Sequence, residues 1–426
     1  MLILSIFIFL IFLICLNVPI AFSLALAGVF GLYMTEGAGS LVTVALDMYD
    51  GSTKFSLIAI PMFVLAGAIM NAGGVTKRLI EFVAALIGAV RGGLSMVSIG
   101  VSLFFAEISG SAVADVAALG SILIPEMKKR GYGAPFAAAV TSSSASLAII
   151  IPPSIPMILY AVSANTSVEQ LFVAGFLPGI MGAVGMMGVS WWFARRYNLP
   201  VEEAFNLKRL RKAAAEAGPT FLLPIIILGG IFGGYVTATE AAGLAVLAAI
   251  GVGMWYREVD FSQLRRAMLE GGMQTAVVMV LVAASVLMGG FLTRAQIPQD
   301  LAAQMIAFTD SKYLILLILN VFFLVIGFFL HSAAAIILVV PIVVPLIQQV
   351  GIDPVHFGLV VTLNLAIGQQ TPPVASVLIT ASSIAKANIW DVSRVNLPFI
   401  LVLFSVLMVC TYVPVIPMFL VELFYR

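Results

Sequence analysis

Long apolar runs separated by short polar loops make up most of this chain. They cover residues 3–34, 55–72, 94–127, 134–165, 171–194, 219–256, 273–293, 313–349, 355–387 and 395–421. A helix needs about 20 consecutive apolar residues to cross the hydrocarbon core of a bilayer. Several runs are too long for one crossing, so we expect them to fold back or to break. The pattern predicts an all-α polytopic membrane protein in a lipid bilayer.

Composition agrees with this class and excludes others. Of the 426 residues, 62% are hydrophobic and 10% are charged, and the mean hydropathy is +1.14. Cys15 and Cys410 lie in apolar runs and indicate neither a disulfide nor a thiolate metal site. A net charge of +1 gives no reason to expect a nucleic-acid partner. The sequence contains no Walker A, GxSxG or HExxH signature, so we expect no enzyme, and if the chain is a transporter an ion gradient must drive it.

The first apolar run has no basic leading region and no cleavage site of the A-x-A type. Residues 1–34 are therefore expected to remain in the membrane rather than to act as a signal peptide. They form either two helices broken near Asn17-Val18-Pro19 or one long tilted helix.

Two diprolines reveal an internal repeat. IIIPPSIP at 149–156 is followed 220 positions later by QQTPPVAS at 369–376, and the same offset places Pro125 on Pro345. Residue identity between the two stretches is otherwise low, which is typical of transporter halves that share an architecture more than a sequence. A proline within a helix removes a backbone donor and clashes with the preceding turn, at roughly 3 kcal/mol. We therefore expect a broken helix in each half.

The basic residues indicate that the two halves are inverted. Lys128-Lys129-Arg130 follows the first long run, whereas the matching loop at 348–354 contains no Lys or Arg. The positive-inside rule places the first loop in the cytoplasm and the second outside. With this orientation, the Lys and Arg residues that fall outside are Lys54, Arg294, Lys312 and Arg426.

These features predict an organisation into five segments. N-terminal scaffold helices occupy 1–50, the first inverted repeat 51–197, a cytoplasmic linker with a surface helix 198–218, scaffold helices 219–270 and the second inverted repeat 271–426. Each repeat contains a re-entrant helical hairpin and a broken helix, at 94–127 and 134–165 in the first and at 313–349 and 355–387 in the second.

The breaks and the hairpin tips are the candidate binding elements. Unwound backbone at membrane depth survives only against protein or a water-filled cavity, where its carbonyls can hold Na⁺ and half-helix N-termini can face an anion. The first tip is Ser109-Gly110-Ser111, and at the offset of 220 Ser111 falls on His331. Ser144 and Ser146 lie within about two turns of the first break. The alternatives are prolines that only bend helices and serines that only allow close helix packing.

Three ionisable residues fall inside apolar runs, namely Glu107, Asp115 and His331. Such groups are costly in lipid, which makes them candidates for proton transfer or ion coupling. The two acids could instead bond to the hairpin backbone or to a partner helix, and His331 could be a neutral residue that donates to a carbonyl. No metal-ligand cluster accompanies His331, so zinc is not expected.

Three segments carry a resemblance to a known family. EISGSAVADVAALGSILIPEMKKRGY (107–132), AIIIPPSIPMILYAV (148–162) and GIDPVHFGLVVTLNLAIGQQTPP (351–373) resemble the large membrane subunit of tripartite ATP-independent periplasmic (TRAP) transporters. The resemblance implies an elevator-type transport domain that moves against a scaffold, and Na⁺-coupled uptake of an organic acid with two or more Na⁺ sites. It places the protein in a bacterial or archaeal cytoplasmic (inner) membrane.

The resemblance also implies partners and site residues. The partners are a soluble periplasmic substrate-binding protein and a small four-helix membrane subunit, expected as a separate chain because this one starts at MLILSIFIFL. The cation ligands are expected among Ser109, Gly110, Ser111, Ile151, Pro152, Leu330, His331, Ser332, Gln370, Thr371 and Pro372. Substrate contacts are expected from Ser144, Ser146, Pro153, Ser154 and Pro373.

The sequence departs from the family pattern at the second tip and the second break. His331 stands where an acidic residue is usual, and Ala366, Gln369 and Gln370 differ from an NLEIGLLTPP-like segment. Two other functions fit the same pattern: a binding-protein-independent symporter or antiporter for anions, and a membrane scaffold or channel without coupled transport.

Overall fold

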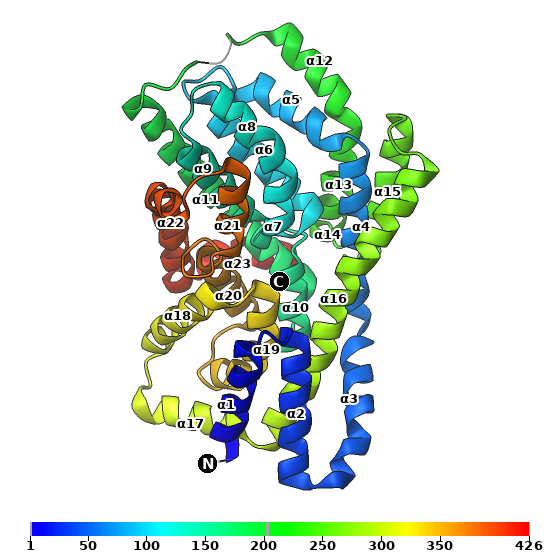
Figure 1. The fold of residues 1–426 in the computed structure, drawn as a ribbon, viewed down its shortest axis with the longest axis vertical. Helices are drawn as coiled ribbons and strands as arrows, with labels where there is room; N and C mark the ends of the chain where they lie inside the picture. Colours follow the sequence, from blue (N-terminus) through cyan, green and yellow to red (C-terminus); the bar gives the residue numbers. More distant parts are fainter. Residues whose placement is uncertain (1, 202–203, 426) are drawn as a thin grey trace.

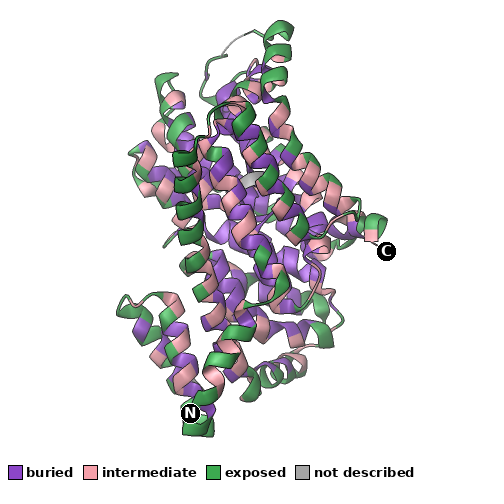
Figure 2. Ribbon diagram, turned by 90° about the vertical axis from the view of Figure 1, so that its right-hand side faces the viewer, coloured by how far each residue is buried: buried purple, intermediate pink, exposed green. Residues whose placement is uncertain are grey.

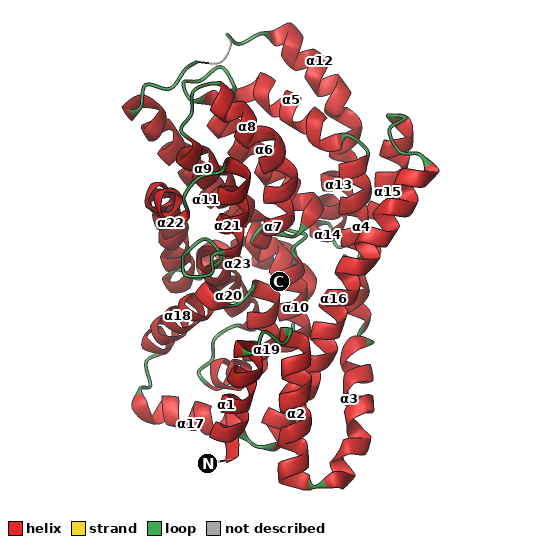
Figure 3. Ribbon diagram, viewed as in Figure 1, coloured by secondary structure: helices red, strands yellow, loops and turns green. Residues whose placement is uncertain are grey.

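The computed structural model describes residues 2–201 and 204–425, and these residues form helices joined by short loops (Figure 3). Eight of the described helical segments are long and apolar enough to cross a membrane, which confirms the all-α polytopic class. They are Phe55–Ala72, Val168–Arg196, Leu207–Phe232, Ala238–Trp255, Phe261–Arg294, Lys312–Phe329, Ser332–Gln349 and Ile389–Tyr412.

The N-terminal run forms two helices rather than one. Helix α1 (Leu2–Cys15) ends before Pro19, and α2 (Ile20–Glu36) returns beside it, with the rings of Phe9 and Phe30 5.1 Å apart. Helix α3 (Leu41–Ser52) follows. The break lies at Asn17-Val18-Pro19, as the first of the two alternatives required.

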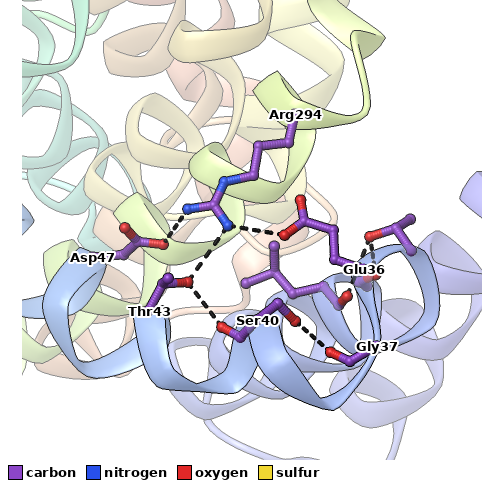
Figure 4. A network of polar contacts seen from close by, with 9 residues as sticks. Glu36, Gly37, Ser40, Thr43, Asp47 and Arg294 are labelled. Atoms are coloured by element: carbon purple, nitrogen blue, oxygen red, sulfur yellow. Dashed lines mark hydrogen bonds and ion pairs between the residues drawn. The ribbon is translucent and has the colours of Figure 1, made fainter.

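Arg294 joins this N-terminal unit to a long helix, α16 (Phe261–Arg294), as Figure 4 shows. Its guanidinium lies 3.4 Å from the carboxylate of Glu36 on α2 and 3.0 Å from that of Asp47 on α3. Thr43 accepts a further bond from the same group at 3.5 Å. Because these charges are partly exposed, the ion pairs orient the helices more than they stabilise them.

The first half of the chain continues with amphipathic and broken helices. Its elements are α4 (Ala59–Ala72), α5 (Val75–Ile87), α6 (Gly93–Ser109), α7 (Ala112–Asp115), a π-helical turn (Val116–Gly120), α8 (Ser121–Lys129), α9 (Ala134–Ala145), a 3-10 turn (Ser146–Ile149), α10 (Ile155–Ala164) and α11 (Val168–Arg196). Figure 1 shows α5, α8 and α12 (Leu207–Ala217) at the end of the molecule opposite to α3 and α17 (Ile297–Phe308).

The second half repeats the order of long, broken and long helices. After α13 (Leu222–Pro224) and α14 (Gly230–Phe232) come α15 (Ala238–Trp255), α16, α17, α18 (Lys312–Phe329), α19 (Ser332–Gln349), α20 (Pro354–Gly368), α21 (Ser376–Ala385), α22 (Ile389–Tyr412) and α23 (Val415–Tyr425). Helix α16 starts at an Asp260–Gln263 capping box and runs without interruption past the expected segment boundary at 270/271. No break in the chain marks that boundary.

The core lies around the two broken helices. Every residue of α20 from Val355 to Gly368 is buried, as is every residue of α9 from Phe136 to Ala145. Figure 2 shows the buried residues gathered in the middle of the bundle and the exposed ones on the outer helices. A helix that is apolar all round must be surrounded by other helices. Helix α16 packs outside this core, against α2, α3, α4 and α19.

Candidate transport site

The first hairpin turns at Ser109, Gly110 and Ser111. Gly110 ends α6 in the left-handed region, with φ +59°, and Ser111 is extended before α7 begins at Ala112. A Cβ atom on Gly110 would lie 2.9 Å from the carbonyl oxygen of Pro153, closer than real Cβ contacts. Glycine therefore serves both the backbone conformation and the close approach to the first break.

The first broken helix opens between α9 and α10. Residues 150–154 leave the helix, and the Pro152–Pro153 bond is cis. Ser154 caps α10: its hydroxyl donates to the carbonyl of Ile149 at 2.8 Å and accepts from the amide of Met157 at 3.4 Å. Ile151, Pro152, Pro153 and Ser154 are buried. The hydroxyl of Ser154 thus holds the helix end, and the sequence had assigned it to the substrate.

The second hairpin and the second break make a comparable contact. Helix α18 ends at Phe329, Leu330 and His331 are extended, and α19 starts at Ser332. Gly368 at the end of α20 lies so close to Gly327 that an added Cβ atom would meet its backbone at 2.6 Å. The amide of Val374 donates to the carbonyl of Phe328 at 3.2 Å. In each half, the hairpin therefore rests on the unwound loop of the broken helix that follows it.

A cleft of about 430 Å³ brings the two halves together. The hairpin tips and helix breaks contribute Gly110, Ser111, Ala112, Val113, Ala114, Ala117, Ile149, Ile155, Pro156, His331, Ser332, Ala333 and Gln369. The opposite wall comes from α4 and α16 and consists of Val64, Met273, Gln274, Val277 and Val278. Segments more than 200 positions apart in the sequence thus face one space.

The cleft contains four of the predicted site residues, Gly110, Ser111, His331 and Ser332. It also contains Gln369, which was not among the predicted site residues although its neighbour Gln370 was, and the wall from α4 and α16, which the sequence did not predict. The two adjacent glutamines at 369–370 are a polar signal in the sequence that could have identified Gln369 as a site residue. Apolar residues such as Val64 and Met273 carry no sequence signal, because any membrane helix contains them.

Other predicted residues have different surroundings. Ser144 accepts a bond from Ser102 at 2.8 Å, and Ser146 donates to the carbonyl of Ser142 at 3.3 Å, so both bond within helix packing. Thr371 donates to the carbonyl of Ile367 at 3.0 Å. Leu330, Thr371 and Pro372 are half-buried, whereas Pro373 is exposed.

Gln370 belongs to a buried polar cluster that links the two halves. The hydroxyl of Ser143 on α9 donates to its Oε1 atom at 2.8 Å and also contacts Asn396 on α22. The amide of Asn396 donates to the same Oε1 atom at 3.2 Å, and Gln370 Nε2 donates to the carbonyl of Ala366 at 3.4 Å. With its side chain used in this way, Gln370 can offer a cation only its backbone carbonyl.

The two acidic candidates are buried in the first hairpin. Glu107 is 6% exposed, and its Oε2 atom has no hydrogen-bond partner among the described residues. Asp115 is fully buried: the hydroxyl of Ser109 donates to its Oδ1 atom, and its Oδ2 atom is without a partner in the described part of the chain. No group of three His, Cys, Asp or Glu side chains occurs among the residues searched, which are the described ones. A hydroxyl and a carboxylate are nevertheless ligands that a hard cation prefers.

A second cleft of about 330 Å³ adjoins the first and shares Val64, Ala114 and Gln274 with it. It runs along α4, α6 and the first turns of α16, where Arg266 and Glu270 contribute charged groups. Arg266 lies near the end of α16 that the charge pattern assigns to the cytoplasm.

Together, the helices and the clefts define a multi-pass membrane transporter. The family described as "Tripartite ATP-independent periplasmic transporter, DctM component" matches residues 7–416. The chain belongs to this family, and it is therefore a transporter permease of the inner membrane and not an enzyme.

Individual relatives cover nearly the whole chain. It is 40% identical over 407 residues to the isethionate TRAP transporter permease protein DctMQ of Oleidesulfovibrio alaskensis, which is 95% of this chain but 64% of that protein. It is 37% identical to the C4-dicarboxylate TRAP transporter large permease protein DctM of Pseudomonas aeruginosa, over 88% of each chain. Among solved structures, the Alcanivorax borkumensis YdaH transporter matches with a TM-score of 0.64 and 14% identity over 89% of each chain, a likeness of fold alone.

Proposed function

We propose that this chain is the Na⁺-coupled, substrate-translocating subunit of a TRAP system that imports an organic acid. The observation that carries the proposal is the cleft in which both hairpin tips and both helix breaks face α4 and α16. The relatives that transport isethionate and C4-dicarboxylates support an organic anion as the substrate. A soluble periplasmic binding protein delivers this anion, and a small membrane subunit completes the scaffold.

The first hairpin tip is the proposed position of one Na⁺ ion. Asp115 and Ser109 bond to each other there, one oxygen of Asp115 has no partner among the described residues, and the loop at 150–154 presents its backbone. The second tip and the loop at 369–375 form the second position, where backbone carbonyls of Gln370, Thr371 and Pro372 supply the ligands. Each position pairs a helix interruption with a hairpin tip.

The elevator movement assigns each helix to one of two bodies. The hairpins and broken helices of the two inverted repeats (α6 to α10 and α18 to α21) move together, because the tips and the breaks contact one another directly. Helices α4 and α16 form the wall against which they slide. That wall is largely apolar, which leaves few polar contacts to break during the movement.

Reconstituted transport tests the function. Vesicles that contain the chain, the small subunit and the binding protein should take up the anion when Na⁺ is high outside, and much less when choline replaces Na⁺. Without its partners, the purified chain should show a saturable rise in melting temperature with NaCl that choline chloride at equal ionic strength does not produce, since a ligand of the folded state stabilises it. Equal uptake with and without a Na⁺ gradient would refute the proposal.

The double variant Ser111→Asp with Pro153→Ala tests the position of the site. Ser111→Asp introduces a second carboxylate beside the hydroxyl of Ser109, and Pro153→Ala loosens the loop under Gly110. We expect Na⁺-driven uptake to be lost while the chain remains in the membrane. Unchanged uptake would show that the assignment of this tip is wrong.

A further inference from the structure

We infer that the cleft accepts a substrate with a single acidic group, bound at the α19 end, and that Gln369 is the residue that selects it. The inference rests on the proposed function and adds the substrate class. It follows from a difference between the two tips, from one side chain without a partner and from the composition of the opposite wall.

Gln369 is buried in the cleft, and its side-chain amide nitrogen lacks an acceptor among the described residues. It is 2% exposed and lines the cleft, and its Nε2 atom has no hydrogen-bond partner among the described residues. The neighbouring Gln370 differs, because its amide bonds to Ser143, Asn396 and Ala366. Burying an amide donor without an acceptor is costly. An acceptor on the substrate, such as a carboxylate or sulfonate oxygen, removes this cost.

The start of α19 supplies further donors at the same end. This helix has 18 residues. The first of its amides to donate a backbone hydrogen bond is that of Ala335, which bonds to the carbonyl of His331. The amides of Ser332, Ala333 and Ala334 have no acceptor in the described part of the chain, and His331 makes no side-chain cap. Free amides and the helix dipole attract an anion. Ser332 and Ala333 line the cleft together with Gln369.

The first tip has the opposite character. Asp115 occupies the first turn of α7, whereas α19 has no acidic residue in its first turn. At the offset of 220, Asp115 corresponds to Ala335. A carboxylate behind Ser111 attracts a cation and repels a second acidic group of the substrate. The two ends of the cleft therefore differ: the first tip has an acidic side chain behind it, whereas the second presents unpaired backbone donors at the start of α19.

The wall that α4 and α16 contribute to this cleft carries no charged side chain. Val64, Met273, Val277 and Val278 are apolar, and Gln274 is neutral. No Lys, Arg, Asp or Glu is among the described residues that line the cleft. A second carboxylate turned toward this wall would meet no charged partner among these residues. An uncharged, partly apolar body would instead bury its surface there.

Ligand-dependent melting of the full-length chain in NaCl tests the inference. The probes are butyrate and succinate, which have the same carbon number and differ by one carboxylate, with isethionate as a sulfonate of single charge. We expect butyrate or isethionate to bind at least about tenfold more tightly than succinate, a difference of about 1.4 kcal/mol. Gln369→Leu should weaken the singly charged probes by about tenfold or more, the range of a hydrogen bond to a charged group.

Two further variants keep the result interpretable. Gln348→Leu makes the same change at an exposed residue near the other end of α19 and should leave the affinities unchanged. Val277→Arg places a cation on the exposed wall of the cleft and should raise the affinity for succinate relative to butyrate. This variant is a gain of function, so misfolding cannot imitate the expected result.

The outcomes separate this inference from the proposed function. Succinate binding as tightly as the singly charged probes, or unchanged affinities in Gln369→Leu, would refute the inference and leave organic-anion transport intact. Failure of every probe to bind in NaCl, together with Na⁺-independent uptake, would remove the proposed function and the inference with it.

Discussion

The contact between Gly110 and the first helix break can be tested by one added methyl group. Gly110→Ala places a Cβ atom 2.9 Å from the carbonyl oxygen of Pro153, which is 0.5 Å short of an ordinary contact at 3.4 Å. The left-handed backbone, at φ +59°, costs a non-glycine residue about 1–2 kcal/mol. Overpacking of this kind adds about 1–3 kcal/mol. We expect a total loss of roughly 2–5 kcal/mol in the free energy of unfolding, the sum of these two costs.

Gly131→Ala is the matched control. Gly131 has φ +86°, but a Cβ atom there would meet nothing within 4 Å, so this variant carries the backbone cost alone. Melting temperatures of the purified variants should therefore fall in the order wild type, Gly131→Ala, Gly110→Ala. The Na⁺-specific rise in melting temperature should survive in Gly131→Ala and be reduced in Gly110→Ala, because only the latter moves the tip away from its loop.

Equal destabilisation of the two variants would refute this reasoning. It would mean that the tip does not rest on the loop at 150–154, and that the close approach of Gly110 to Pro153 contributes nothing to stability. A normal Na⁺ response in a clearly destabilised Gly110→Ala would separate the packing argument from the cation site.

Three further predictions concern buried and exposed polar groups. Asn396→Leu removes a donor from the cluster with Ser143 and Gln370. It should lower the free energy of unfolding by about 1–3 kcal/mol, measured by thermal or denaturant unfolding. An unchanged free energy of unfolding would show that the cluster does not stabilise the fold. Arg294→Gln breaks two partly exposed ion pairs and should cost less than about 1 kcal/mol, so a larger shift in melting temperature would contradict it. Glu107→Gln replaces a buried carboxyl that has an unbonded oxygen and should not lower the melting temperature; a clear decrease would reveal a bond to the carboxylate.

Sequence reasoning located the helices and their interruptions because both have local causes. Apolar length requires helices in a bilayer, and the diprolines stop a helix wherever the chain folds. The breaks lie at 150–154 and 369–375, on the two diproline segments. The prediction of two N-terminal helices also had a local cause, because it depended on Pro19. The correspondence of the two hairpin tips, Ser111 in the first half and His331 in the second, also came from the sequence offset of 220.

The roles of individual polar side chains depended on neighbours that no local pattern specifies. Gln369 and Gln370 are identical and adjacent, yet the amide nitrogen of the first has no acceptor among the described residues, whereas the side chain of the second bonds to Ser143 and Asn396. Their difference arises because successive side chains of an unwound loop point in different directions, toward whatever surrounds them. Ser144 and Ser146 were assigned to the substrate, and in the structure their hydroxyls bond to Ser102 on α6 and to the carbonyl of Ser142 on α9, respectively.

The class of helical membrane transporter and its two interrupted halves could be predicted from the chain alone, since membrane length, charge asymmetry and proline positions are properties of the sequence. Which surfaces meet depends on how the helices pack in three dimensions. The wall of α4 and α16 became part of the cleft through contacts between segments distant in sequence. Its apolar side chains acquire meaning for binding only from the polar tips that face them.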